Sequence, residues 1–169
     1  GEDCDDSDSA ATEDFGCGCG LDAAQEGMDC DGNCLEGSNV TLTLIDSYGD
    51  SWNGNSLTIN GVTYDQPTTA SGGASDSYSL CLDLSTCISV TYNADGTYPG
   101  ENSWEITDAT GVLASGGGES GRVGNCIDGC TDDTACNYDA TANVEDDSCT
   151  YADQYLNCDG SCINDTDGD

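Results

Sequence analysis

Branched or aromatic residues alternate with polar residues through the middle of the chain, which is the period of a half-buried β-strand. The alternation is clearest in residues 40–49 (VTLTLIDSYG), 76–84 (DSYSLCLDL) and 87–94 (CISVTYNA). No stretch shows the 3.6-residue period of an amphipathic helix, and small polar residues dominate between the strands. The pattern predicts about six to eight short strands between residues 38 and 126.

Two turn signals join these strands into hairpins. Asn60-Gly61 divides residues 55–64 into two short strands, and residues 102–117 form another pair that turns at Asp108–Gly111. Strands this short, with turns throughout, predict a small antiparallel β-sandwich. The run SGGGESG at 115–121 predicts a flexible connection near its end. The expected core residues are Leu42, Leu44, Trp52, Leu57, Ile59, Val62, Leu80, Leu82, Ile88, Val90, Trp104, Ile106 and Leu113.

Acidic residues and cysteines divide the chain into three parts. Residues 38–126 contain 10 of the 34 acidic residues and 3 of the 13 cysteines, so the flanks carry most of both. The flanks also have too few large apolar residues to form a core, so they need disulfides or bound metal ions to stabilise a fold. We therefore expect a mainly β chain. An acidic, Cys-rich linker module spans 1–37, the β-sandwich spans 38–126, and irregular disulfide- and calcium-stapled modules span 127–169.

The net charge of −33, with one basic residue and no histidine, excludes several functions. Repulsion on this scale opposes compaction unless cations bind or salt screens it. It also argues against nucleic acid and anionic membranes as partners, and no stretch has the length of a membrane span. Without His or Lys, the usual activated Ser and Cys nucleophiles are unavailable, so we expect no enzyme. Residue 1 is not Met and no signal peptide is visible, which suggests a mature or internal segment.

Thirteen cysteines in a short chain indicate disulfides and an oxidising, extracellular compartment. Zinc is the disfavoured alternative, because no C-x2-C pair and no His occur. Cys81 and Cys87 are the predicted pair, while Cys30–Cys34 and Cys158–Cys162 either close small loops or bond outward. Because the number of cysteines is odd, we expect one free thiol per unit, or a symmetric cross-link between two polymer strands. The other expected disulfide cysteines are Cys4, Cys17, Cys19, Cys126, Cys130, Cys136 and Cys149.

The flanks contain an internal repeat. Residues 28–37 (MDCDGNCLEG) and 156–165 (LNCDGSCIND) share Cys-Asp-Gly-x-Cys followed by an apolar residue. Each copy is preceded by another cysteine, Cys19 or Cys149, about ten residues upstream. A duplicated cysteine framework suggests a chain assembled from small modules.

The chain ends in half a calcium loop. Asp165, Asp167 and Asp169 occupy positions 1, 3 and 5 of such a loop, and Gly1 of a following copy would supply the glycine at position 6. Glu2, Asp3 and Asp5 of that copy would provide the later oxygens. This predicts a head-to-tail homopolymer. The alternative is a boundary inside a longer array of non-identical modules.

Two further stretches are candidate calcium sites. One lies between Cys136 and Cys149, and its alternative is a solvated acidic loop. Its expected ligands are Asn137, Asp139, Asn143, Asp146 and Asp147. The other is DSYGDSWNG, in which Asp46, Asp50 and Asn53 could converge on one ion, with Glu101 as a further ligand. Its alternative is a turn in which Asp and Asn bond the local backbone.

Three segments resemble modules of very large secreted bacterial surface proteins. They are GCTDDTACNYDATANVEDDSCTY with CDGSCINDTDGD, the β-rich LTLIDSYGDSWNGNSLTINGV with ENSWEITDATGVLASGG, and GCGCG with GMDCDGNCL. The terminal string also resembles thrombospondin type 3 and dockerin calcium loops. The resemblance implies calcium binding, disulfides and an extracellular structural or adhesive role without enzyme activity.

We therefore expect a structural repeat of an extracellular bacterial filament or surface fibre, rigidified by calcium and joined head to tail at the cell surface. The alternative is an adhesin or carbohydrate-binding module, in which exposed Tyr48, Trp52 and Tyr98 would contact glycans. The simpler interpretation of Trp52 and Trp104 is that they belong to the core.

Overall fold

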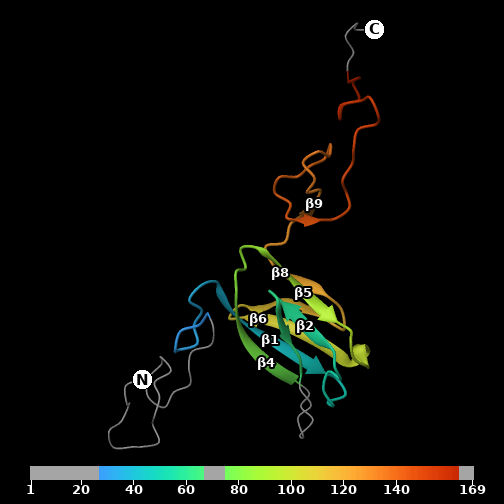
Figure 1. Cartoon of the computed structure of the whole chain (residues 1–169). Coiled ribbons are helices and arrows are strands. Elements are labelled where there is room, and N and C mark those ends of the chain that lie inside the picture. Colours follow the sequence, from blue (N-terminus) through green and yellow to red (C-terminus); the bar gives the residue numbers. More distant parts are fainter. Residues whose placement is uncertain (1–26, 67–74, 164–169) are drawn as a thin grey trace, which may run out of the picture.

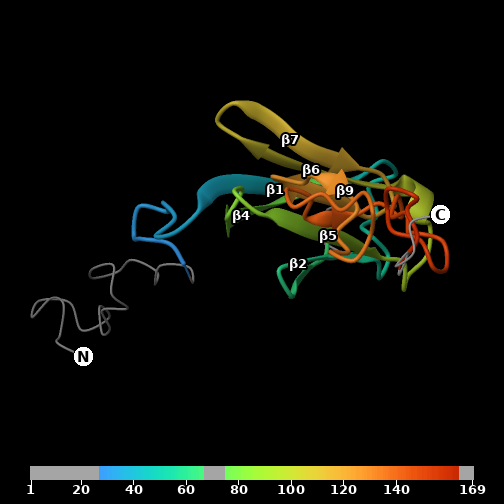
Figure 2. The same ribbon diagram turned by 90° about the horizontal axis from the view of Figure 1, so that it is seen from above.

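The computed structural model describes residues 27–66 and 75–163, which form a two-layer antiparallel β-sandwich followed by a C-terminal module (Figures 1 and 2). The strand order in the first sheet is β4 (Ser75–Leu82), β1 (Ser38–Asp46), β6 (Asn102–Asp108) and β7 (Gly111–Gly116). In the second sheet it is β3 (Val62–Tyr64), β2 (Ser56–Ile59), β5 (Cys87–Asn93) and β8 (Gly121–Gly124). The prediction of a mainly β chain with an antiparallel sandwich is confirmed.

The core lies between the two sheets, where the alternating apolar side chains of both inner faces meet. Leu42 and Leu44 on β1 are fully buried, and neither Trp52 nor Trp104 is more than 1% exposed. Each indole N–H donates to a backbone carbonyl at 3.0 Å, that of Ile45 for Trp52 and that of Glu119 for Trp104. Both tryptophans therefore belong to the core, with their single polar atoms satisfied.

Two residues predicted for the core are exposed. Val62 is 52% exposed and Leu113 is 36% exposed; both lie on edge strands, β3 and β7, which bury no residue. Val40 and Val123 are buried in their place. Alternation identifies the face of a strand, but it does not show which strands form the edges.

The glycine-rich run at 115–121 packs tightly and is not a simple flexible connection. Its first residues end β7 and its last residue begins β8, a strand that the sequence does not predict. A Cβ atom on Gly116 or Gly121 would lie 2.8 Å from ring atoms of Trp104. These glycines therefore allow the backbone to close over the indole ring.

The described segments that precede and follow the sandwich both join it at the same end. Ser38, at the start of β1, pairs with Leu82 at the end of β4, and Cys87 at the start of β5 pairs with Gly124 at the end of β8. The loops at 46–55 and 94–101 lie at the opposite end. Figure 1 shows the C-terminal module beyond one end of the sheets, with the β1 arrow running away from it.

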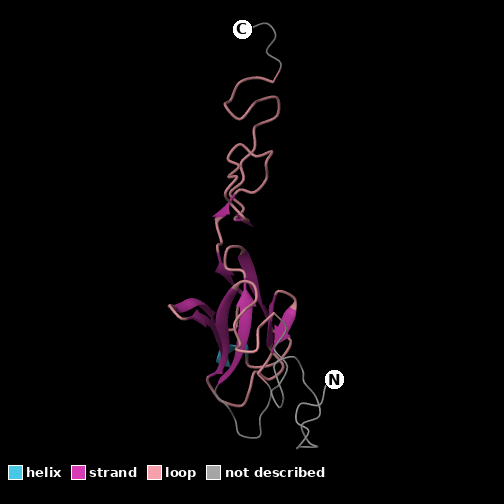
Figure 3. Cartoon of the chain, turned by 90° about the vertical axis from the view of Figure 1, so that its left-hand side faces the viewer, coloured by secondary structure: helices cyan, strands magenta, loops and turns pink. Residues whose placement is uncertain are grey.

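The C-terminal module has almost no hydrophobic core. Cys130 and Ala135 are its buried apolar residues, and its regular structure in the described residues is a parallel pair, β9 (Asp128–Gly129) with β10 (Val144–Glu145). Figure 3 shows it extending from the sandwich as looped chain. Two disulfides, Cys130–Cys149 and Cys136–Cys158, close it. Each would contribute about 3–4 kcal/mol by restricting the unfolded chain.

The predicted pair Cys81–Cys87 is wrong. The turn after β4 crosses from one sheet to the other, so the two cysteines lie in different layers. Cys81 bonds Cys34, and Cys87 bonds Cys126.

The small loops proposed for Cys30–Cys34 and Cys158–Cys162 do not form either, because Cys34 and Cys158 bond outward, to Cys81 and Cys136. Cys30 is disulfide-bonded. Cys162 is free and exposed, so its inclusion among the disulfide cysteines is wrong, whereas the expectation of a free thiol agrees with it. Cys4, Cys17 and Cys19 lie outside the described residues.

Replacing Gly116 by alanine should destabilise the sandwich by about 1–3 kcal/mol, the usual effect of overpacking a core. The new methyl group would collide with the ring of Trp104. Gly117→Ala is the matched control, because the nearest atom to its Cβ would be 3.9 Å away. Urea unfolding followed by tryptophan fluorescence measures both. Equal stabilities of the two variants would contradict the packing role.

Candidate functional site

Asp46, at the end of β1, holds the loop that follows it. Its side chain is 1% exposed, and its two carboxylate oxygens accept the backbone N–H groups of Tyr48, Gly49 and Ser51 at 2.8–3.0 Å. The loop can close this tightly because Gly49 and Ser51 both have φ of 88°, in the left-handed region. A buried carboxylate with three donors is stable in place, yet it retains lone pairs that could bind a cation.

Asp50 lies on the same loop and is exposed. The amide nitrogen of Asn53 donates to Asp50 Oδ1 at 2.8 Å and to the carbonyl of Ser51 at 2.7 Å. The Asn53 amide N–H groups thus point toward Asp50 and orient its carboxylate. Of the three ligands predicted here, Asp46 and Asp50 offer oxygens to one site, and Asn53 orients the carboxylate of Asp50.

Glu101 reaches the same site from the second loop. It ends the short 3-10 helix η1 (Pro99–Glu101), which follows Tyr98 in the left-handed conformation. Its backbone carbonyl accepts the N–H of Ser47 at 2.9 Å. Three further bonds join the loops, since Asn55 contacts Thr97 and Gly96 through its side chain and Thr97 N–H donates to Asn53.

The carboxylate oxygens of Asp46, Asp50 and Glu101 lie within 4.8 Å of one another. Two ligands of one calcium ion are at most about 5 Å apart, because each Ca–O distance is about 2.4 Å. The spacing therefore fits a shared cation. Partial removal from water raises the pKa of the Glu101 carboxyl, and the charges of Asp50 and Asp46 raise it further. A divalent cation would relieve this repulsion.

The predicted site between Cys136 and Cys149 is not gathered in this way. Asn137 bonds the backbone of Ser148 and Thr150, and Asp139 Oδ1 accepts the N–H and hydroxyl of Thr141. Asp146 accepts the N–H of Ser148. Within residues 27–66 and 75–163, Asp139, Asp146 and Asp147 belong to no group of three acidic or cysteine ligands within 4.8 Å.

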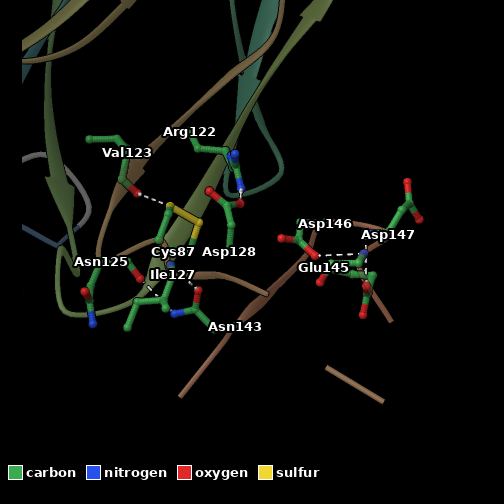
Figure 4. Close-up of polar contacts among 12 residues, drawn as sticks. Cys87, Arg122, Val123, Asn125, Ile127, Asp128, Asn143, Glu145, Asp146 and Asp147 are labelled. Atoms are coloured by element: carbon green, nitrogen blue, oxygen red, sulfur yellow. Dashed lines mark hydrogen bonds and ion pairs between the residues drawn. A yellow bond between two sulfur atoms is a disulfide. The ribbon is translucent and has the colours of Figure 1, made fainter. Parts of the chain in front are cut away.

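Asn143, predicted as a ligand of that site, instead joins the module to the sandwich (Figure 4). Its Oδ1 accepts the N–H of Ile127 at 2.9 Å, and its Nδ2 donates to the carbonyl of Asn125 at 2.8 Å. Beside it, Arg122 forms an ion pair with Asp128, and the Cys87–Cys126 disulfide holds the last residue of the sandwich next to the same joint. The sequence signal for this joint is that the only basic residue of the chain, Arg122, lies five positions before the module begins at residue 127.

The remaining predicted ligands, Asp165, Asp167, Asp169, Glu2, Asp3 and Asp5, lie outside the described residues. Glu101, which the sequence suggested only as an additional ligand, is one of the three acids that converge. No sequence signal beyond its place in a loop identifies it, because the proximity of the two loops arises from the folding of both sheets.

Comparison of the chain with protein-family models, curated proteins and solved structures finds no match. In the part of the chain that the structure describes, no helix has the length and hydropathy required to cross a membrane.

Replacing Glu101 by glutamine should remove one bound calcium ion per chain, because the cluster loses the charge and one of its converging oxygens. Glu105→Gln is the matched control, since it makes the same charge change on the neighbouring strand β6. Isothermal titration calorimetry gives the number of ions bound. If both variants bind as many ions as the unaltered chain, the cluster is not a calcium site.

Proposed function

We propose that this chain is a structural unit of an extracellular fibre, stapled by disulfides, rigidified by calcium and joined head to tail. The observation that carries the proposal is the placement of the disulfides. Cys34–Cys81 ties the segment before the sandwich to its edge strand, and Cys87–Cys126 ties β5 to the chain leaving the sandwich. Cross-links at each junction suit a chain that bears tension.

The joint in Figure 4 supports the same role. The Arg122–Asp128 ion pair is about half exposed, so it contributes little by itself, about 0–1 kcal/mol. Asn143 adds two hydrogen bonds, and the backbone N–H groups of Asn143 and Val144 both donate to Ile127. Several short-range contacts plus a disulfide restrict bending, which is the property needed in a load-bearing linker.

Calcium contributes in two ways to this proposal. It would neutralise part of a net charge of −33, which otherwise opposes packing of one unit against another. It would also fix the two loops that carry Asp46, Asp50 and Glu101. Metal binding would then be linked to stability and assembly.

Calcium should assemble the purified full chain into filaments and raise its thermal midpoint, and chelation should reverse both. Light scattering and negative-stain electron microscopy measure assembly, with magnesium at equal ionic strength as the control for screening. A chain that stays monomeric at every calcium concentration, with an unchanged midpoint, would contradict the proposal.

A second candidate function is glycan binding at the calcium cluster. Tyr48 is 76% exposed and Tyr98 is 63% exposed, and they lie on the two loops that carry the acidic residues. Aromatic faces beside a cation are suited to sugar rings and their hydroxyl groups. Trp52, also expected to contact glycans, is fully buried and takes no part.

Tyr48→Ala and Tyr98→Ala should each weaken calcium-dependent glycan binding about tenfold, a loss that corresponds to about 1.4 kcal/mol. Tyr138→Ala is the control, because Tyr138 is exposed on the C-terminal module. Glycan-array binding with and without chelator is the measurement. Absence of any calcium-dependent glycan signal from the unaltered chain would exclude this function.

A further inference from the structure

The two Cys-Asp-Gly-x-Cys segments fold as the same hairpin. In the N-terminal hairpin (residues 27–35), Met28 bridges Cys34, and in the C-terminal hairpin (residues 155–163), Leu156 bridges Cys162. In the first hairpin the backbone N–H of Leu35 donates to the carbonyl of Gly27 at 2.9 Å. In the second, the N–H of Ile163 donates to the carbonyl of Tyr155 at 2.7 Å. The equivalent pairs are Gly27 and Tyr155, Met28 and Leu156, Cys30 and Cys158, Gly32 and Gly160, Cys34 and Cys162, and Leu35 and Ile163.

The backbone angles agree as well as the hydrogen bonds. Gly32 and Gly160 have φ of 79° and 81°. Gly27 has φ of 84°, and Tyr155 has φ of 72° although its side chain disfavours the left-handed region. The C-terminal hairpin therefore keeps the conformation of the first even where its sequence opposes it.

The hairpins differ in what covers them. The first cysteine of each, Cys30 or Cys158, is disulfide-bonded. The second cysteine of the N-terminal hairpin, Cys34, bonds Cys81 on the edge strand β4, and Met28 beside it is 7% exposed. In the C-terminal hairpin, by contrast, Cys162 is free and exposed, and Leu156, the equivalent of Met28, is half-buried. The final apolar residue is exposed in both hairpins, Leu35 at 69% and Ile163 at 47%. The hairpins thus differ at the second cysteine and at the residue that bridges it, which are attached to β4 only in the N-terminal hairpin.

The β4 edge has room for the C-terminal hairpin. A Cβ atom on Gly27 would meet no atom within 4 Å, so a side chain at this position would begin in open space. Gly27 also lines a groove of about 580 Å³ between the edges of the two sheets, with Val62, Tyr64 and Tyr78 among its walls. Tyr155, which is 73% exposed, has the size and polarity to enter such a groove.

We propose that the C-terminal hairpin docks on the β4 edge of a second copy of this chain, in place of that copy's own N-terminal hairpin. The Cys162 thiolate attacks Sγ of Cys81 in the second copy. The Cys162–Cys81 bond forms, the Cys34–Cys81 bond breaks, and Cys34 leaves as a thiolate that takes up a proton. The number of disulfides is unchanged, so no oxidant is needed. The inference deepens the proposed function, on which it rests, because it exchanges the Cys34–Cys81 cross-link within one copy for a covalent joint between two copies.

Charge controls how readily the two surfaces meet. The hairpin carries Asp159, and the β4 edge is flanked by Asp76 and Asp83. Copies of such acidic chains repel each other at low ionic strength, and salt screens that repulsion. Exchange should therefore accelerate as salt or calcium is added.

The test uses the full, unaltered chain, mixed from isotope-labelled and unlabelled batches and concentrated at high ionic strength. We expect a ladder on a non-reducing gel, a Cys162–Cys81 peptide containing one labelled and one unlabelled partner, and Cys34 open to alkylation. Cys162→Ser should abolish the ladder, and this exposed position tolerates the change without loss of fold. The control combines Cys162→Ser with Ala140→Cys, which places an exposed thiol elsewhere on the module. It should link to Cys81 at least about tenfold more slowly, because it lacks the docking face.

Three results would overturn the exchange: only Cys162–Cys162 links, a Cys162–Cys81 link confined to single chains, or equal rates for the Ala140→Cys control. The proposed function fails separately. Calcium-dependent filaments without the Cys162–Cys81 peptide would reject the exchange and retain the fibre. The linked peptide without filaments would retain the exchange and reject the fibre.

Discussion

Repulsion among 34 acidic side chains, opposed by one arginine, limits how this chain can fold. The sandwich keeps nearly all of these charges out of its core, with Asp46 as the buried exception. Elsewhere a recurrent turn accommodates them. Asp83, Asp132, Asp139 and Asp159 each accept the N–H and the hydroxyl of a Ser or Thr two residues later. These bonds lower the pKa of each carboxyl, so the charge is held at the surface by local backbone.

Many acids are placed in turns, and the described residues outside the sandwich bury little apolar surface. Disulfides replace the missing core there, and they do so between elements rather than within them. This explains why pairing by sequence proximity fails. Cys81 and Cys87 are six positions apart, but the chain changes sheet between them. Cross-links between segments that are distant in sequence hold those segments in a fixed spatial arrangement.

Alternation and turn chemistry predict the sandwich well, because both depend on local sequence. The Asn60-Gly61 hairpin and the burial of Leu42 and Leu44 follow directly from the pattern. The tight packing of Gly116 and Gly121 on Trp104 could not be predicted, since a glycine-rich run looks the same whether it is flexible or closely packed. The same limit applies to the site. Asp46 and Asp50 share one loop, but the approach of Glu101 depends on the tertiary fold.

The two hairpins show how one element can serve different contacts. Its own hydrogen bonds fix the turn, so the face that carries the second cysteine is presented in the same way in both copies. What differs is the neighbour, which is a β-strand edge for Cys34 and solvent for Cys162. Since both hairpin and module join the sandwich at one end, the loops of the acidic cluster project from the other. A unit joined through its C-terminal hairpin would therefore leave those loops free. Linkage and display of the acidic cluster are thus compatible in a single unit, because they use opposite ends of the same sandwich.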